Sequence, residues 1–322
     1  METPRALKRR RRFAAAWRRT ARWGSILGLL LLAACAPAMG SPTPTPWRPP
    51  TAVPSATPTV TPVPSPSPTP TLTPTPTPLA CWHQGGTLRS VSLETSDLPH
   101  PLPVIVYLPP CYDQLPQARY PVLYLFHGQN FDEHQWVRLG VPQTADRLIA
   151  AGEAPPFIVV MPGEDTWTQP ADTGFDEAVL HTLMPWVEAH FHTRNERQYR
   201  AVGGLSRGAS WAIHFGLSQW QLFGSIGGHS PPIFWEDVGY IRPWLEAIPE
   251  GEWPRIYLDI GRGDQQQILS SAQWFEQILT QGEYPHEWHL NIGRHNEAYW
   301  SAHVEAYLRW YTAAWREDQA AP

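Results

Sequence analysis

The residue pattern with the clearest chemical meaning is Gly204-Leu205-Ser206-Arg207-Gly208. A Gly-x-Ser-x-Gly sequence between a strand and a helix is typical of a nucleophile elbow, a tight turn that holds the serine hydroxyl above the end of a sheet. Residues 199–203 predict the strand, and residues 206–217 have helical spacing. Because Gly204 and Gly208 lack Cβ atoms, they permit such a turn. We therefore expect Ser206 to be a nucleophile rather than a bystander in a glycine-rich turn.

A serine hydroxyl is a weak nucleophile and needs a base within hydrogen-bond reach. His295 lies in a predicted turn between a strand at 289–292 and the last helix, and catalytic groups gather in loops at the carboxyl ends of parallel strands. His214 lies two turns into the helix after Ser206, so its side chain cannot turn back. We expect His295 to be the base, with His229 as the alternative. The histidines that follow the serine are His214, His229, His286, His289, His295 and His303.

The base in turn needs a carboxylate that orients its ring and stabilises its charged form. Asp264 follows the apolar run 255–260 in the short loop Gly261-Arg262-Gly263-Asp264. Asp259 lies inside that run and is the alternative. A loop position at the end of a strand suits an orienting carboxylate, although aspartate after glycine is also common in plain turns. We expect Asp264 to be the acid.

The oxyanion of an acyl-transfer reaction needs two N–H donors. The backbone N–H of Arg207 is expected to be the first, because this residue follows the nucleophile. The second should come from the turn after the apolar run 121–126, where the sequence continues His127-Gly128-Gln129. We expect the N–H of Gln129 to be that donor.

Strand and helix patterns alternate over about 200 residues, which predicts a mostly parallel α/β sheet with helices on both faces. Of the 17 tryptophans we expect most to be packing residues, and one or two to line a cleft for a ring-shaped ligand. The predicted strands are 104–108, 121–126, 157–161, 199–203, 223–226, 255–260 and 289–292, and the predicted helices are 142–151, 175–191, 206–217, 268–280 and 301–315.

Composition excludes several functional classes. Nine of the 24 basic residues lie in the first 22 positions, and beyond residue 34 the balance is 15 arginines against 28 acids. A basic nucleic-acid groove is therefore not expected. Lys8 is the single lysine, which excludes Schiff-base chemistry, a Ser–Lys dyad and a phosphate-loop lysine in a mature protein without its signal. With Cys35 set aside as the expected lipidation site, the two remaining cysteines and scattered histidines predict no metal site, and no cofactor is expected.

The N-terminal segment predicts export. A basic stretch at residues 5–22 precedes about ten apolar residues, as in a signal peptide that is too short to span a bilayer. The ending Leu32-Ala33-Ala34-Cys35 resembles a bacterial lipobox, so residues 1–35 are expected to be a lipoprotein signal with Cys35 lipidated. The alternatives are an uncleaved anchor or an ordinary signal with a chance cysteine. We expect an extracytoplasmic protein tethered to the membrane through lipid.

Residues 36–80 contain 16 of the 37 prolines and read as a Pro/Thr-rich linker, extended and without a core of its own. Residues 81–322 remain for one domain with a sizeable core. Cys81 and Cys111 form an even pair in an oxidising compartment, and we expect a disulfide between them rather than two separate buried thiols.

The motif set resembles the esterase D-like family of α/β-hydrolases, which includes feruloyl, acetyl-xylan and siderophore esterases, S-formylglutathione hydrolases and mycolyltransferases. The likeness runs from about residue 86 to residue 310. It is carried by segments 107–112, 120–128, 156–162, 185–188 and 203–208 together with Trp136.

The resemblance implies an α/β-hydrolase fold, a triad of Ser206, Asp264 and His295, and oxyanion donors at Gln129 and Arg207. Arg207 stands where the family commonly has Met and Ala209 where Gly is usual, so we expect both to alter the cleft wall. The expected function is a serine carboxylic-ester hydrolase acting on carbohydrate-linked or aryl esters. Acyl transfer to a sugar and a non-catalytic carbohydrate-binding surface protein are the alternatives.

Overall fold

A computed structural model describes residues 80–317. The predicted signal peptide, Cys35 and all but the last residue of the predicted linker lie outside the described residues, so these assignments stay predictions. Within residues 80–317, no helix is both long enough and apolar enough to cross a membrane.

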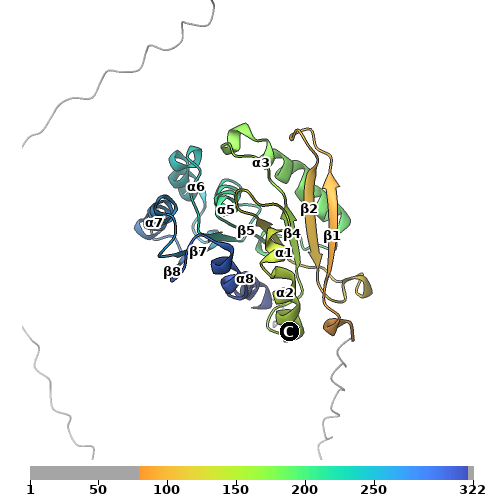
Figure 1. Cartoon of the computed structure of the whole chain (residues 1–322). Helices are drawn as coiled ribbons and strands as arrows, with labels where there is room; N and C mark the ends of the chain where they lie inside the picture. Colours follow the sequence, from red (N-terminus) through yellow and green to blue (C-terminus); the bar gives the residue numbers. More distant parts are fainter. Residues whose placement is uncertain (1–79, 318–322) are drawn as a thin grey trace, which may run out of the picture. The chain divides into compact units, whose positions relative to one another are not determined.

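One eight-stranded sheet forms the centre of the domain (Figure 1), in the spatial order β1-β2-β4-β3-β5-β6-β7-β8. β1 and β2 are antiparallel, as are β2 and β4, and all other neighbours are parallel. The predicted mostly parallel α/β sheet is confirmed. In chain order, β1 to β8 are Thr87–Leu93, Leu102–Leu108, Val122–Phe126, Ile158–Pro162, Arg200–Leu205, Ser225–His229, Arg255–Gly261 and Glu287–Asn291.

Helices cover both faces of the sheet, and each face has its own apolar core. Successive side chains of β3 alternate between the two cores: Leu123 and Leu125 enter one, and Tyr124 and Phe126 enter the other. Strands covered on both faces are apolar throughout, which is why β3 is predictable as a continuous run. The core of Leu123 contains residues of α1 (Gln135–Arg138), α2 (Val141–Ala150) and α8 (Glu297–Glu317), and the core of Tyr124 contains residues of α4 (Met184–His190), α5 (Arg207–Ser218), α6 (Ile241–Ala247) and α7 (Gln266–Gln281).

Some element predictions are wrong in detail. The predicted strand 223–226 begins two residues later and continues through Gly227 and Gly228 to His229. The predicted helix 175–191 is a continuous helical run, but residues Ala178–Leu183 form a π-helix between α3 (Phe175–Glu177) and α4. β1 and α6 have no counterpart among the predicted elements.

The predicted disulfide is confirmed, because Cys81 and Cys111 are bonded. The bridge joins two residues 30 positions apart and encloses the antiparallel β1–β2 hairpin at the edge of the sheet. In the chain-entropy model a loop of this size stabilises the fold by about 3–4 kcal/mol. The disulfide therefore fixes the start of the domain to the segment that follows β2.

Candidate active site

Ser206 lies between the end of β5 and the start of α5 in a backbone conformation that few L-residues adopt, with φ 52° and ψ −123°. A Cβ atom at Gly204 would lie 2.2 Å from the Gly208 carbonyl oxygen, and one at Gly208 would lie 2.2 Å from the Phe126 carbonyl oxygen. The Ser206 N–H donates to the carbonyl of His229 at 2.8 Å. Such a turn stores about 1–3 kcal/mol of strain, held by the surrounding structure. The predicted elbow geometry is present.

The structure brings Ser206, His295 and Asp264 together. The Ser206 hydroxyl lies 2.8 Å from Nε2 of His295, and Nδ1 of His295 lies 2.8 Å from Oδ1 of Asp264. The second pair of atoms is in contact but is not aligned as a hydrogen bond, and Oδ1 also accepts the Gln265 N–H at 2.6 Å. The Asp264 side chain is fully buried, and within residues 80–317 its Oδ2 has no hydrogen-bond partner. A buried carboxylate in this place can orient the imidazole and stabilise its charged form, and the imidazole can then take the proton of the serine hydroxyl.

The alternative base and the alternative acid pair with each other instead. His229 and Asp259 are register partners on β6 and β7, and both side chains are fully buried. Nδ1 of His229 lies 2.7 Å from Oδ1 of Asp259, and its Nε2 lies 3.1 Å from the Tyr311 hydroxyl. Neither side chain therefore faces the Ser206 hydroxyl.

Tyrosines of α8 complete this second pair. Oδ2 of Asp259 accepts hydrogen bonds from the hydroxyls of Tyr299 at 2.5 Å and Tyr307 at 2.8 Å. Burial, and after it the Asp259 carboxylate, raise the pKa of Tyr299 and Tyr307 far above the ordinary value, so both hydroxyls remain protonated donors. We call His229, Asp259, Tyr299, Tyr307 and Tyr311 the buried Asp259 cluster, and it joins α8 to β6 and β7.

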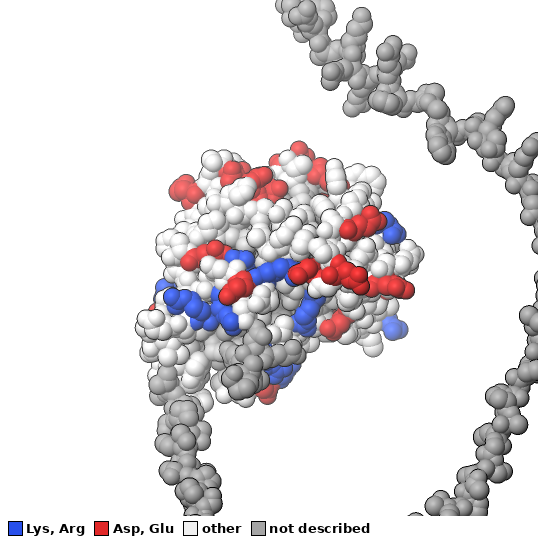
Figure 2. Space-filling view, turned by 180° about the vertical axis from the view of Figure 1, so that it is seen from behind, with Lys and Arg blue, Asp and Glu red and all other residues white. Residues whose placement is uncertain are grey.

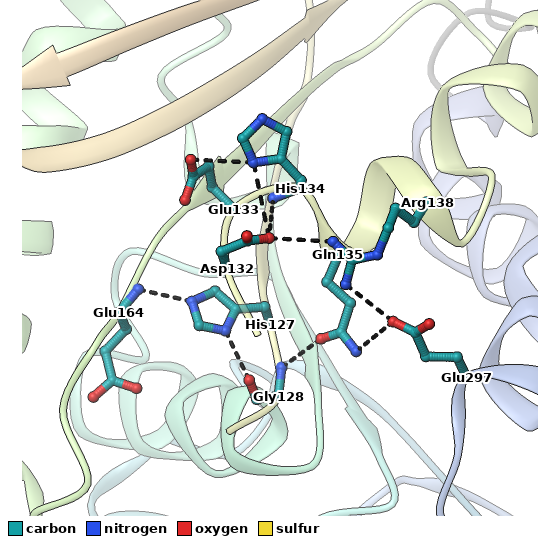
Figure 3. A network of polar contacts seen from close by, with 9 residues as sticks. All are labelled: His127, Gly128, Asp132, Glu133, His134, Gln135, Arg138, Glu164 and Glu297. Carbon is teal, nitrogen blue, oxygen red and sulfur yellow. Dashed lines mark hydrogen bonds and ion pairs between the residues drawn. The ribbon is translucent and has the colours of Figure 1, made fainter. Parts of the chain in front are cut away.

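The loop after β3 lies beside Ser206 and is held by side chains from other elements (Figure 3). A Cβ atom at Gly128 would be 3.5 Å from Cβ of Ser206, which places this loop against the elbow. The Gly128 N–H donates to Oε1 of the fully buried Gln135 at 2.8 Å, and Nε2 of Gln135 donates to Glu297 at 3.2 Å. Glu297 is the first residue of α8 and lies two positions after His295. The predicted oxyanion donor, Gln129, therefore follows a residue, Gly128, that is connected through Gln135 to the start of α8.

His127 connects the same loop to the loop after β4. Its Nε2 accepts the Glu164 N–H at 2.7 Å, so its Nδ1 carries the proton and donates to the Gly128 carbonyl at 2.8 Å (Figure 3). Burial lowers the pKa of His127, and nearby carboxylates oppose that shift only in part. This histidine is therefore a neutral connector between two loops at the carboxyl edge of the sheet.

Arg207 and Ala209, which were expected to alter the cleft wall, do not line it directly, because both side chains are buried. The Arg207 guanidinium makes a two-pronged ion pair with Glu164, with both N–O distances at 2.7 Å, and also donates to the Thr168 carbonyl at 2.8 Å. Arg207 thus holds the loop after β4 against the elbow. Its backbone N–H, the predicted first oxyanion donor, belongs to the first residue of α5 and has no partner within the helix.

A cavity of about 300 Å³ lies next to these loops, over the β2 and β4 side of the sheet. Phe131 and Glu133 line it from the loop after β3, and Glu164 and Thr166 line it from the loop after β4. Ser206 does not line this cavity, so the cavity is connected to Ser206 only indirectly, through the Arg207–Glu164 ion pair.

Comparison with known proteins now places this domain. A family model described as "Putative esterase" matches residues 95–316. The chain belongs to this esterase family. An esterase from Mycobacterium tuberculosis is 28% identical over 228 residues, covering 55% of this chain and 48% of the relative. An endo-1,4-beta-xylanase/feruloyl esterase from Xylanibacter ruminicola is 35% identical over 138 residues, covering 38% of this chain and 18% of the relative. The esterase-family chain therefore spans about half or less of the length of these two relatives.

Solved structures support the α/β-hydrolase fold of this esterase-family domain. A ferulic acid esterase superposes with a TM-score of 0.65 at 22% identity, covering 71% of this chain and 98% of that chain. An S-formylglutathione hydrolase from Staphylococcus aureus gives a TM-score of 0.58 at 18% identity, covering 71% and 98%. The predicted family and fold class are confirmed.

Proposed function

We propose that this chain is a serine carboxylic-ester hydrolase that uses Ser206, His295 and Asp264 as a triad. The observation that carries the proposal is the 2.8 Å contact between the Ser206 hydroxyl and Nε2 of His295, at a strained elbow with the buried Asp264 behind the ring. Membership of the esterase family and the feruloyl esterase and esterase relatives support the same reaction class.

In the acylation step the Ser206 oxygen attacks the ester carbonyl carbon while Nε2 of His295 takes the hydroxyl proton. The carbonyl π electrons move to oxygen, and the backbone N–H groups of Arg207 and Gln129 stabilise that oxyanion. When the tetrahedral intermediate collapses, the bond to the alcohol oxygen breaks and His295 returns the proton to the leaving alcohol. Ser206 is then acylated.

Deacylation repeats the sequence with water as nucleophile. His295 takes a proton from water, the hydroxide attacks the acyl carbon, and the carboxylic acid leaves as the proton returns to the Ser206 oxygen. A sugar hydroxyl in place of water would give acyl transfer. Carbohydrate-linked or aryl esters are the proposed substrates, and the predicted lipid at Cys35 and the Pro/Thr-rich linker would hold the domain outside the cell membrane.

The full chain, solubilised in detergent, tests this proposal with p-nitrophenyl acetate, methyl ferulate and acetylated xylan. A fluorophosphonate probe should label Ser206, and Ser206→Ala should lose both labelling and turnover. Undiminished hydrolysis by the Ala variant would reject the triad. Products analysed with and without a sugar acceptor separate hydrolysis from acyl transfer.

The predicted anchor is tested in the same preparation. In a bacterial host the wild-type chain should partition into detergent, and Cys35→Ala should release it or leave it unprocessed. A mature protein whose Cys35 carries no lipid by mass spectrometry would reject the tether.

A further inference from the structure

Two tryptophan side chains, on the loops that follow β4 and β6, are exposed, although tryptophan is usually buried in folded proteins. The side chain of Trp167 is 65% exposed and that of Trp235 is 80% exposed. Exposed aromatic groups that gather in one place mark binding surfaces more often than isolated ones do. The question is whether these two tryptophans lie in one place.

Hydrogen bonds join the loops that carry them. Oε1 of Gln169, two residues after Trp167, accepts the N–H of Glu236 at 3.2 Å, and Oε2 of Glu236 accepts the N–H of Ala171 at 3.2 Å. Glu236 directly follows Trp235 in the sequence. The loops lead into α3 and α6, which lie at the same end of the domain in Figure 1. The two tryptophans therefore stand on neighbouring, mutually fixed loops.

The joined loops are also tied to the nucleophile. Arg207, the residue after Ser206, donates to the Thr168 carbonyl at 2.8 Å, and its guanidinium carbon lies 5.1 Å from the centre of the Phe234 ring. Thr168 follows Trp167 and Phe234 precedes Trp235. One buried arginine thus holds both loops beside the elbow. Both tryptophans thus lie on loops that contact the residue directly after Ser206.

The polar groups around the tryptophans indicate the chemistry of the ligand. Several oxygens of these loops are engaged within the protein, as in the Glu164–Arg207 and Glu236–Ala171 contacts. Asp165 and Thr168 are exposed within two positions of Trp167, and their side-chain oxygens can accept hydrogen bonds. A sugar ring matches this surface, because it presents an apolar C–H face to an indole and donates hydroxyl hydrogens to the acceptors. An anionic membrane does not match, because residues 163–171 and 231–238 contain four acidic residues and no basic residue. Acidic side chains also lie along the top of the face shown in Figure 2.

We propose that Trp167 and Trp235 form an aromatic platform for the uncharged sugar that is esterified in the substrate. The proposal deepens the ester hydrolase function proposed above and rests on it. The platform binds the alcohol part of the ester, while the acyl carbon lies at Ser206. It therefore selects carbohydrate-linked esters over simple alkyl esters of the same acid.

A pair of substrates with one acyl group tests the platform on the full chain. Feruloylated arabinose and methyl ferulate differ only in the alcohol. In the double variant Trp167→Ala/Trp235→Ala, kcat/KM for the sugar ester should fall by about 10- to 100-fold, mainly through KM, as the loss of two aromatic contacts predicts. Methyl ferulate hydrolysis should stay within about twofold, since it makes no platform contact.

Matched variants separate ring stacking from damage to the fold. Trp167→Phe/Trp235→Phe keeps two aromatic faces and should restore most of the sugar-ester activity. Leu88→Ala removes an exposed side chain from the edge strand β1 and should change neither substrate's kinetics. An equal loss for both esters, or no loss for the sugar ester, would overturn the platform.

Binding measurements distinguish this failure from a failure of the proposed function. If the wild type hydrolyses neither ester, ester hydrolysis is rejected, and the platform is tested by calorimetry with a neutral arabinoxylan oligosaccharide. Binding by the wild type that is lost in the double Ala variant supports the platform, and absence of binding overturns it. Binding to phosphatidylglycerol vesicles that depends on the two tryptophans, with sugar-ester kinetics unchanged, would assign them to a lipid surface and also overturn it.

Discussion

Two of the Asp–His pairs in this domain, Asp264–His295 and Asp259–His229, are built alike and placed differently. In both, a carboxylate oxygen lies against Nδ1 of the ring, at 2.8 Å for Asp264 and His295 and at 2.7 Å for Asp259 and His229. The outer nitrogens differ: Nε2 of His295 faces the Ser206 hydroxyl, and Nε2 of His229 faces the Tyr311 hydroxyl. A carboxylate-backed imidazole is therefore a candidate base only where its second nitrogen faces a group that can react.

Strand position explains the difference. His229 and Asp259 belong to β6 and β7, where helices cover both faces of the sheet. Asp264 and His295 lie in the loops that follow β7 and β8, at the carboxyl ends of these strands. The two pairs still meet at Ser206, since the His229 carbonyl accepts its N–H and the His295 ring faces its hydroxyl. One pair fixes the backbone of Ser206, the proposed nucleophile, and the other contacts its hydroxyl.

Removing the imidazole of His295 should have the largest effect on turnover. His295→Ala is expected to lower turnover of p-nitrophenyl acetate by about four orders of magnitude or more, as for triad histidines in serine proteases. His229→Gln, its counterpart in the buried pair, should stay within about tenfold wherever near-ultraviolet circular dichroism shows a folded protein. A folded His295→Ala variant with near-normal turnover would remove the distinction between the pairs.

Exchanging each aspartate for asparagine separates the carboxylates. Asp264→Asn keeps the shape of the side chain but favours the wrong imidazole tautomer, so turnover should fall by about two to four orders of magnitude. Asp259→Asn should retain activity to within about tenfold, because its side chain belongs to the sheet. A well-folded Asp259→Asn protein without activity, beside a nearly normal Asp264→Asn protein, would reverse the assignment of the acid.

Asp259→Asn should lose more stability than Asp264→Asn, although Asp264→Asn should lose more activity. Asp259 accepts from Tyr299, Tyr307 and the His229 ring in a fully buried site, so Asp259→Asn should lower the free energy of unfolding by about 2–4 kcal/mol. Asp264→Asn should cost about 1 kcal/mol or less, because Oδ2 of Asp264 has no partner among the described residues. Urea unfolding monitored by tryptophan fluorescence measures both, and equal losses would contradict the ranking.

His127 sharpens the comparison as a buried imidazole whose two nitrogens bond to backbone groups. Because burial lowers its folded pKa, the unfolded chain takes up the proton first as pH falls through about 6.5. Its contribution to stability is thus present at neutral pH and is lost on acidification, by at most about 1.4 kcal/mol per pH unit. Between about pH 7.5 and about pH 5.5, wild type should lose about 1 kcal/mol more unfolding free energy than His127→Gln. If urea unfolding showed the same loss of unfolding free energy between these pH values for both proteins, the prediction would be wrong.

The covered strands and long helices of this fold are predictable because burial on both faces leaves continuous apolar runs. β1 is not, because most of its seven residues are exposed at the sheet edge and give no alternating pattern. β6 is only partly predictable: Gly227 and Gly228 weaken the strand signal, yet a Cβ atom at Gly227 would lie 1.7 Å from the Tyr311 hydroxyl. The glycine that obscures the strand in the sequence makes room for the buried Asp259 cluster.

Some residues of the candidate site are likewise predictable from the sequence, and others are not. Ser206, His295 and Asp264 are predictable because a local motif marks the serine and the order of elements marks the other two. Gln135 and Glu297 are separated by 162 positions and Arg207 and Glu164 by 43, and a single sequence has no local pattern that pairs them. These contacts hold the loops around Ser206 and are visible only in the folded structure.

The disulfide at the start of the domain has a mechanical consequence. Both strands of the β1–β2 hairpin lie inside the covalent loop that Cys81 and Cys111 close. Tension applied to the chain before residue 81 passes through the sulfur atoms directly to residue 111, so it does not load the hydrogen bonds of the edge strand one after another. A domain pulled from its N-terminal side, as the proposed tether would pull it while the catalytic face is bound to an immobile substrate, thus resists unzipping from its weakest strand.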